Sequence, residues 1–130
     1  RQLTGNALRD ILGERAPEKS GKAALREEKA MVRHVILWQL KDEFSEEEKR
    51  EKKALVKAGL EGLAGQIPGL LSIRVHTEGL ASSSADMMLD SCFEDEASLK
   101  AYSVHPAHVA VADGAVRPNV KTRVCLDFEA

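Results

Sequence analysis

The sequence has few aromatic residues, little net charge and no long apolar run. Aromatic residues make up only 4% of the 130 residues, so the stacking surface of single-stranded nucleic acid binders is missing. The formal net charge of -2 provides no basic field that would attract nucleic acid or an anionic membrane surface. Because no run of about 18 apolar residues occurs, the sequence predicts no membrane-spanning helix. Neither nucleic acid nor a membrane is therefore an expected partner.

Cysteines are also few. Cys92 and Cys125 are the two in the chain, and each lies in an apolar stretch with strand character. A disulfide framework in a chain this short would need more cysteines, so we interpret both as small buried thiols. The N-terminus lacks the uninterrupted apolar core of a signal peptide. We expect a reducing compartment and a cytoplasmic location.

Residues 1–30 differ in character from the rest of the chain. Apolar residues at helical spacing between Leu3 and Leu12 predict a short helix, and the polar stretch that follows has the composition of a linker. We interpret this segment as a partly helical N-terminal extension, either a cloning remnant or the product of a start site placed too early. Residues 31–130 are predicted to form the folded domain, which opens on a strong strand directly after Met31.

The pattern after Met31 predicts strand, helix, strand, strand, helix, strand. The first strand is apolar on both faces, as in strands buried on both sides. Ser45-Glu-Glu-Glu48 is a capping box that begins a helix, and Pro68-Gly69 ends it. Asp95 is predicted to cap the second helix. The predicted strands are residues 32–40, 70–76, 85–93 and 124–128.

This order of elements is that of the split βαβ, ferredoxin-like α+β fold. It predicts one four-stranded antiparallel sheet with both helices on one face. We expect the other face to be bare and to carry Ile36, Trp38 and similar apolar residues. Since nothing else in the chain can cover that face, we predict a homodimer joined through the sheet faces with two-fold symmetry.

Histidine and tyrosine residues are the candidates for chemistry. Tyr102, His105 and His108 are spaced three apart and would share one helix face, although Pro106 interrupts the helix. His34 lies on the first strand, on the side expected to face a cavity. Imidazole titrates near neutrality, so these residues in a dry pocket predict acid–base chemistry. The alternative is structural: a helix end at His105, a hydrogen-bonded His108 and a core Tyr102 with its hydroxyl satisfied.

The histidines also raise the question of zinc. No closely spaced His-x-His or Glu-x-x-His pattern supports a site, so we predict no metal ligands. His76 is interpreted as an exposed strand residue. Asp86 and Asp90 alternate along one strand and are interpreted as solvent-facing or interface charges.

The chain resembles the stress-responsive A/B barrel (Dabb) family over residues 31–129, and three segments carry the resemblance. Met31-Val-Arg-His-Val-Ile-Leu-Trp-Gln-Leu-Lys is similar to the family's opening strand. Asp86-Met-Met-Leu-Asp-Ser-Cys-Phe-Glu is similar to its third strand. Ala101-Tyr-Ser-Val-His-Pro-Ala-His-Val resembles its motif of a tyrosine followed by His-Pro-x-His. The resemblance implies a dimeric α/β barrel of ferredoxin-like subunits, each with an internal cavity.

One branch of that family consists of plant polyketide cyclases, which close a poly-β-keto chain by intramolecular aldol condensation. The resemblance implies that His108 would remove a proton next to a carbonyl and that Tyr102 would hydrogen-bond the developing enolate. His34 would orient or polarise the substrate. Such chemistry needs neither a metal nor an organic cofactor.

Three functions remain open at this point. The first is a homodimer that binds a small apolar or aromatic molecule, with proton-transfer or cyclase-like chemistry. Its cavity would include Ile36, Trp38 and His105 as ligand contacts, beside the catalytic candidates His34, Tyr102 and His108. The second is a non-catalytic, stress-associated structural protein, and the third is a cofactor-free oxygenase acting on aromatic substrates.

Overall fold

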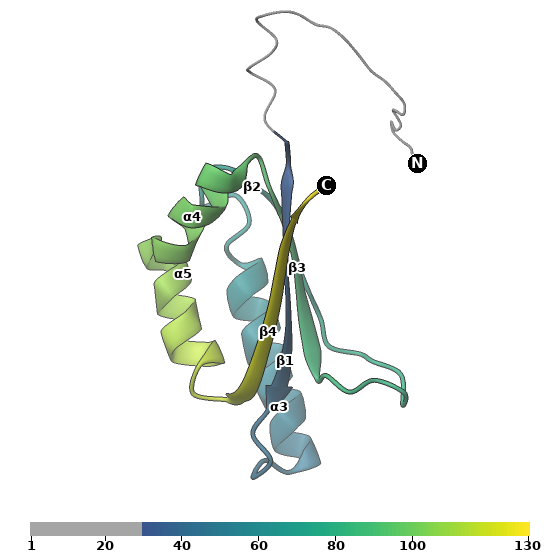
Figure 1. The fold of residues 1–130 in the computed structure, drawn as a ribbon. Helices are drawn as coiled ribbons and strands as arrows, with labels where there is room; N and C mark the ends of the chain where they lie inside the picture. Colours follow the sequence, from purple (N-terminus) through teal and green to yellow (C-terminus); the bar gives the residue numbers. More distant parts are fainter. Residues whose placement is uncertain (1–29) are drawn as a thin grey trace, which may run out of the picture.

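The computed structural model describes residues 30–130, so the predicted extension, residues 1–30, lies outside it except for Ala30. Within the described range the strands form one antiparallel sheet in the order β2-β3-β1-β4 (Figure 1). These strands are β1 (Val32–Leu40), β2 (Leu70–His76), β3 (Met87–Phe93) and β4 (Val120–Glu129). The order is that of the predicted ferredoxin-like α+β fold, with the first and last strands as neighbours.

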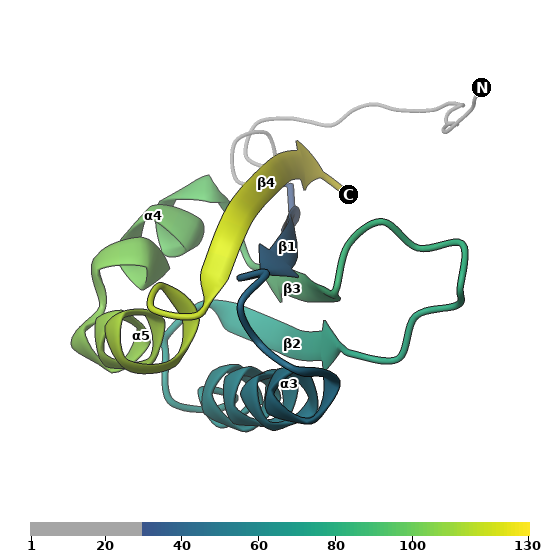
Figure 2. The same ribbon diagram turned by 90° about the horizontal axis from the view of Figure 1, so that it is seen from below.

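Helices cover one face of this sheet. They are α3 (Glu46–Glu61), α4 (Glu96–Val104), α5 (Pro106–Val111) and the π-helical turn η1 (Ala112–Val116). Figure 2 shows α3 below β2, whereas α4 and α5 lie to the left of the strands. The second predicted helix is thus a series of shorter segments, because Pro106 interrupts it as expected. No helix in the part of the chain that the structure describes is long and apolar enough to cross a bilayer.

Alternation along β1 separates a core face from an outer face. The core face carries Val32, His34, Ile36, Trp38 and Leu40, all buried. Ile36 and Trp38 belong to the same hydrophobic core as Val56 and Leu60 of α3. The prediction that Ile36 and Trp38 would lie on the bare face is therefore wrong, because the alternation turns them toward the helices.

The outer face is nevertheless apolar near β4. Leu37 pairs with Val124 across the sheet, and Leu126 and Phe128 follow at alternate positions of β4. The exposed fractions of these four residues are 41%, 64%, 63% and 42%, in the order Leu37, Val124, Leu126 and Phe128. We call these four residues the outer stripe. The argument for a covered sheet face thus holds with a different set of residues.

The capping box starts α3 as predicted. The Ser45 hydroxyl accepts a hydrogen bond from the Glu48 amide at 3.1 Å, and the Glu48 carboxylate accepts one from the Ser45 amide at 2.8 Å. The helix ends at Glu61, before the predicted stop at Pro68. Leu55 of this helix is 48% exposed. Val56 and Leu60 provide the buried face of the helix.

Gly69 allows α4 to approach the start of β2. Its φ is +85°, and a Cβ placed there would lie 2.5 Å from the Ser98 Cβ. Its carbonyl accepts a hydrogen bond from the Glu94 amide at 2.9 Å, next to the N-cap of α4. Gly65 has a similar φ of +79°, but a Cβ there would meet nothing within 4 Å. A side chain at either glycine would strain the backbone, but only one at Gly69 would also clash with a neighbouring residue.

We predict that Gly69→Ala destabilises the fold more than Gly65→Ala. Both variants carry the left-handed backbone strain of about 1–2 kcal/mol. Only Gly69→Ala adds overpacking against Ser98, for which about 1–3 kcal/mol is typical. Urea unfolding of the two variants and the parent chain measures the difference. Equal losses of unfolding free energy would show that Gly69 is not needed for the docking of α4.

Candidate functional site

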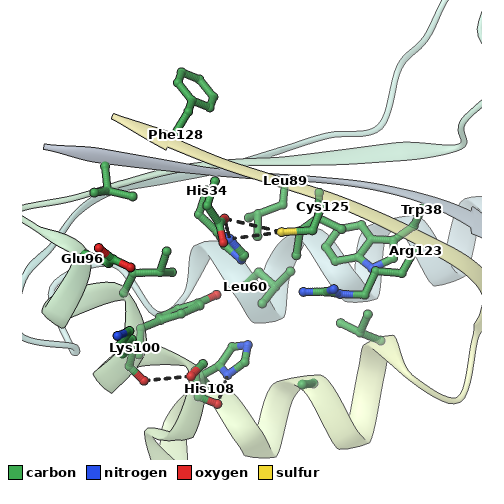
Figure 3. A pocket seen from close by; sticks show the side chains of 18 of the residues that line it. His34, Trp38, Leu60, Leu89, Glu96, Lys100, His108, Arg123, Cys125 and Phe128 are labelled. Carbon is green, nitrogen blue, oxygen red and sulfur yellow. Dashed lines mark hydrogen bonds and ion pairs between the residues drawn. The ribbon is translucent and has the colours of Figure 1, made fainter. Parts of the chain in front are cut away.

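A cavity of about 620 Å³ lies between the sheet and the helices α4 and α5 (Figure 3). Its volume is in the range of sites for small organic molecules. Most of the lining is apolar, with Leu60, Leu89, Leu99 and Val116 among the contributors. Polar and charged side chains also line it, among them His34, Tyr102, His108 and Arg123, and these are candidates for orienting a ligand.

The structure brings the three candidate catalytic residues together at this cavity. His34 comes from β1, Tyr102 from α4 and His108 from α5. The ring centroid of Tyr102 lies 4.2 Å from that of His108 and 6.1 Å from that of His34. Tyr102 therefore contacts both imidazoles. Their convergence is a fact of the structure, whereas their catalytic roles stay predictions.

Tyr102 is nearly inaccessible, and its hydroxyl is unusual. The residue is 1% exposed, and its hydroxyl has no hydrogen-bond partner within residues 30–130. An unpartnered buried hydroxyl costs about 1–3 kcal/mol. Burial also raises the pKa of Tyr102 to about 12, so the phenol stays protonated at neutral pH. The structural interpretation expected a satisfied hydroxyl; instead this donor is available to a ligand.

Trp38 is the second such donor. Its indole Nε1 is buried and, like the Tyr102 hydroxyl, has no hydrogen-bond partner in the described residues. Trp38 lines the cavity together with Ile36, the neighbouring core residue on β1. Both predicted ligand contacts on this strand therefore border the cavity. The cavity wall combines apolar surface with two unused hydrogen-bond donors.

His108 has the properties of a base. Its Nδ1 lies 3.3 Å from the Ser103 carbonyl oxygen, which can only accept, so Nδ1 carries the proton and Nε2 keeps a lone pair. Burial lowers the pKa of His108, and the positive charges of Arg117 and Arg123 act in the same direction. The imidazole is therefore neutral at neutral pH, the form that accepts a proton.

His34 is held by a carboxylate across the β1–β4 ladder. The strand register places Asp127 opposite His34, and the His34 Nδ1 is 2.5 Å from the Asp127 Oδ1. The ring also makes an edge contact with Phe93 at a centroid distance of 6.3 Å. A carboxylate in this position fixes the tautomer and orientation of an imidazole. Because the carboxylate oxygen accepts, Nδ1 is the donor in this contact.

Sequence reasoning missed the cavity residues on β4. Arg123, Cys125 and Asp127 occupy alternate positions of one strand and all line the cavity. Cys125 is only partly buried, in contrast to the predicted buried thiol, whereas Cys92 is buried as expected. The signal was present: in a ferredoxin-like order the last strand neighbours the first, so alternate residues of the last strand face His34.

His105 lies outside this cavity lining. Its ring Nδ1 accepts a hydrogen bond from the Ala107 amide at 3.1 Å and so caps α5, with Pro106 as the first helical residue. The structural interpretation of His105-Pro as a helix boundary matches this position. Asp90 pairs with Arg33 at 3.0 Å on the outer face of the sheet, away from the cavity.

The raised pKa of Tyr102 gives a direct spectroscopic prediction, since Tyr102 is the one tyrosine in the sequence. The ultraviolet absorbance of phenolate should be absent near pH 10 and appear only toward pH 12. The folded state favours the neutral phenol. The stability that this carries is complete below the unfolded pKa of about 10 and is lost as the pH rises toward 12.

The urea-unfolded chain, titrated in parallel, provides the control and should form phenolate near the ordinary tyrosine pKa of about 10. Far-ultraviolet circular dichroism at each pH shows whether the chain is still folded. Phenolate formation near pH 10 in folded protein would mean that the Tyr102 hydroxyl is hydrated rather than buried.

Solved structures of similar fold are numerous. One is a dimeric protein of unknown function with a ferredoxin-like fold from Bacteroides fragilis, with 29% identity and a TM-score of 0.72, covering 77% of this chain and 96% of that chain. A dimeric ferredoxin-like protein from Thermobifida fusca has 23% identity and a TM-score of 0.64, covering 78% and 92%.

A hydroxynitrile lyase from Passiflora edulis has 15% identity and a TM-score of 0.60, covering 78% of this chain and 94% of that chain. At such low identity, this structure and the Thermobifida fusca protein show the fold alone. No curated protein sequence matches the chain. The family model for the stress responsive A/B barrel domain, Dabb, matches residues 32–130. With the predicted strand order and the tyrosine and histidine motif in place, the chain belongs to the Dabb family.

Proposed function

We propose that this protein is a homodimer that binds a small apolar or aromatic carbonyl compound in the cavity and catalyses proton transfer on it. The observation that carries the proposal is the unpartnered Tyr102 hydroxyl, buried between the two cavity histidines. A hydrogen-bond donor left without a partner in an apolar site is ready for a ligand oxygen. The neutral His108 is the nearby base.

The reaction follows from these two groups. The His108 Nε2 removes a proton from the carbon next to the ligand's carbonyl, and the electron pair moves onto the carbonyl oxygen. The Tyr102 hydroxyl donates a hydrogen bond to that oxygen as its negative charge develops. Such donors act strongly in a water-poor site because they need no reorganisation during the reaction. The resulting enolate either takes the proton back elsewhere or attacks a second carbonyl, as in ring closure.

His34 and Asp127 support this chemistry from the sheet side. Asp127 accepts the Nδ1 proton of His34, which fixes the ring at the cavity wall. We assign His34 the role of orienting and polarising the bound ligand, since its ring contacts Tyr102. The aliphatic wall of the cavity holds the apolar part of the ligand. None of these steps requires a metal or an organic cofactor.

The homodimer is supported by the outer stripe and by two relatives. Leu37, Val124, Leu126 and Phe128 form an apolar strip on the uncovered sheet face, and a second copy with the same strip would cover it. Two-fold pairing makes such a surface self-complementary. The proteins from Bacteroides fragilis and Thermobifida fusca are described as dimeric.

Deuterium exchange of the methyl protons of acetophenone and of methyl hexyl ketone, followed by proton NMR in D₂O, tests the proton transfer. The wild-type chain should accelerate exchange of at least one ketone. His108→Ala should reduce this acceleration by about 10²- to 10⁴-fold, the usual contribution of a general base. Tyr102→Phe should reduce it by roughly 10²- to 10³-fold, the usual cost of losing one donor to the developing oxyanion.

His76→Ala is the matched control, because His76 is an exposed histidine outside this cavity. It should exchange both ketones at the wild-type rate. A non-catalytic structural protein predicts instead no acceleration by any variant, and exchange that survives His108→Ala would remove His108 as the base.

The dimer has its own test. Leu126→Glu places a charge in the middle of the outer stripe and should convert the dimer to a monomer at micromolar concentration, as measured by sedimentation velocity. Leu55→Glu is the matched control, since Leu55 is an exposed leucine on α3, away from the outer stripe. A wild-type chain that sediments as a monomer, or a Leu126→Glu chain that stays dimeric, would contradict this interface.

A further inference from the structure

Three metal-binding side chains meet at the sheet wall of the cavity. The His34 Nδ1, the Cys125 Sγ and an Asp127 carboxylate oxygen all lie within 4.8 Å of one another. The Cys125 Sγ is 3.7 Å from the His34 Nδ1 and 3.4 Å from the Asp127 Oδ1. In Figure 3 a dashed line joins His34 and Cys125 below the strands. The cluster arises because Cys125 and Asp127 share one face of β4 and His34 lies opposite Asp127 on β1.

The geometry does not fit a Cys–His–Asp nucleophile. In such a triad the carboxylate and the thiol address different nitrogens of the imidazole. Here Asp127 and Cys125 both address the His34 Nδ1. The thiol is also no thiolate, because burial, with a contribution from Asp127, raises the pKa of Cys125. The ligand atoms of His34, Cys125 and Asp127 surround one position, an arrangement that suits a bound cation better than proton transfer between the three side chains.

The distances are close to those of a tetrahedral zinc site. Zinc bonds of about 2.3 Å to sulfur and about 2.1 Å to nitrogen or oxygen place tetrahedral sulfur and nitrogen or oxygen ligands about 3.5 Å apart. The distances from Cys125 to His34 and Asp127 already bracket this separation. Only the short contact between His34 and Asp127 must widen, by somewhat less than about 1 Å, when the metal replaces the shared proton.

We propose that His34, Cys125 and Asp127 form a three-ligand site for zinc or a chemically similar divalent cation. Imidazole with thiolate is a donor set that favours zinc over the oxygen-preferring magnesium and calcium. The cation would replace the Nδ1 proton of His34 and the thiol proton of Cys125. Thiolate and carboxylate together then neutralise its two charges.

The fourth position of this site is left for water or a ligand oxygen, because all three side chains line the cavity. Metal binding also takes the Nδ1 lone pair that otherwise carries the proton shared with Asp127. A bound metal would therefore replace the His34–Asp127 hydrogen bond that holds His34 in the proposed proton transfer.

Cobalt titration of the untagged full-length chain, first treated with a chelator, tests the site. One Co²⁺ per chain should bind and produce a thiolate-to-cobalt charge-transfer band in the near ultraviolet, which Zn²⁺ should then remove by displacement. Cys125→Ser should abolish this band. Asp127→Asn should weaken Co²⁺ binding by at least about 100-fold, since even outer-shell partners of metal ligands contribute 10- to 100-fold.

Two variants serve as controls. Cys92→Ala removes the other thiol of the chain, and Glu129→Gln removes a neighbouring carboxylate on β4. Both should keep the charge-transfer band and the stoichiometry, with circular dichroism showing that each variant is folded. The proposal is overturned if wild-type protein shows no such band at equimolar cobalt, or if the band survives in Cys125→Ser.

Discussion

The antiparallel pairing of β1 with β4 is the constraint on which both faces of this molecule depend. It joins the first and last elements of the described chain over nearly the full length of β1. On the inner face it places Asp127 opposite His34 and Cys125 opposite Ile36. On the outer face the same register aligns Leu37 with Val124. One set of backbone hydrogen bonds therefore creates the polar corner of the cavity and the apolar strip behind it.

The helical half of the site depends on a break in regular structure. Pro106 separates α4 from α5, and His105 caps the new helix with its own ring. This break lets Tyr102 and His108 come from different helices and still lie with their rings 4.2 Å apart. Gly69 contributes from the other end, because it lets α4 lie close to the sheet. Sheet and helices thus each supply part of one small polar cluster in an apolar cavity.

Much of the fold could be predicted from local sequence patterns. The capping box at Ser45, the apolar and β-branched character of β1 and the proline that begins α5 act over a few residues, so the sequence shows them directly. The face of the sheet on which Ile36 and Trp38 lie could not be read in that way. Alternation distinguishes two faces but does not say which of them the helices cover. That choice is made by the packing of the helices on the sheet, where α3 contacts β2 and α4 contacts β1.

The candidate site divides along the same line. Tyr102 and His108 belong to one short motif and were recognisable, as was His34 near the start of its strand. Cys125 and Asp127 become part of the site only through pairing with a strand about 90 residues away in sequence. β4 itself is also longer than predicted, beginning at Val120, because β1 provides a partner for its polar first half. Tertiary pairing, and not local propensity, determines both.

The position of β4 at the edge of the sheet has a consequence for solubility. A ten-residue edge strand offers its unpaired amides and carbonyls to any other extended chain, and such edges promote aggregation. Charged residues are a common protection against this, and β4 carries Lys121, Arg123, Asp127 and Glu129 among its apolar positions. Arg123 therefore lines the cavity and also belongs to the edge strand of the sheet. Replacing it by an apolar residue would alter the cavity and also make the strand more prone to join foreign β-structure.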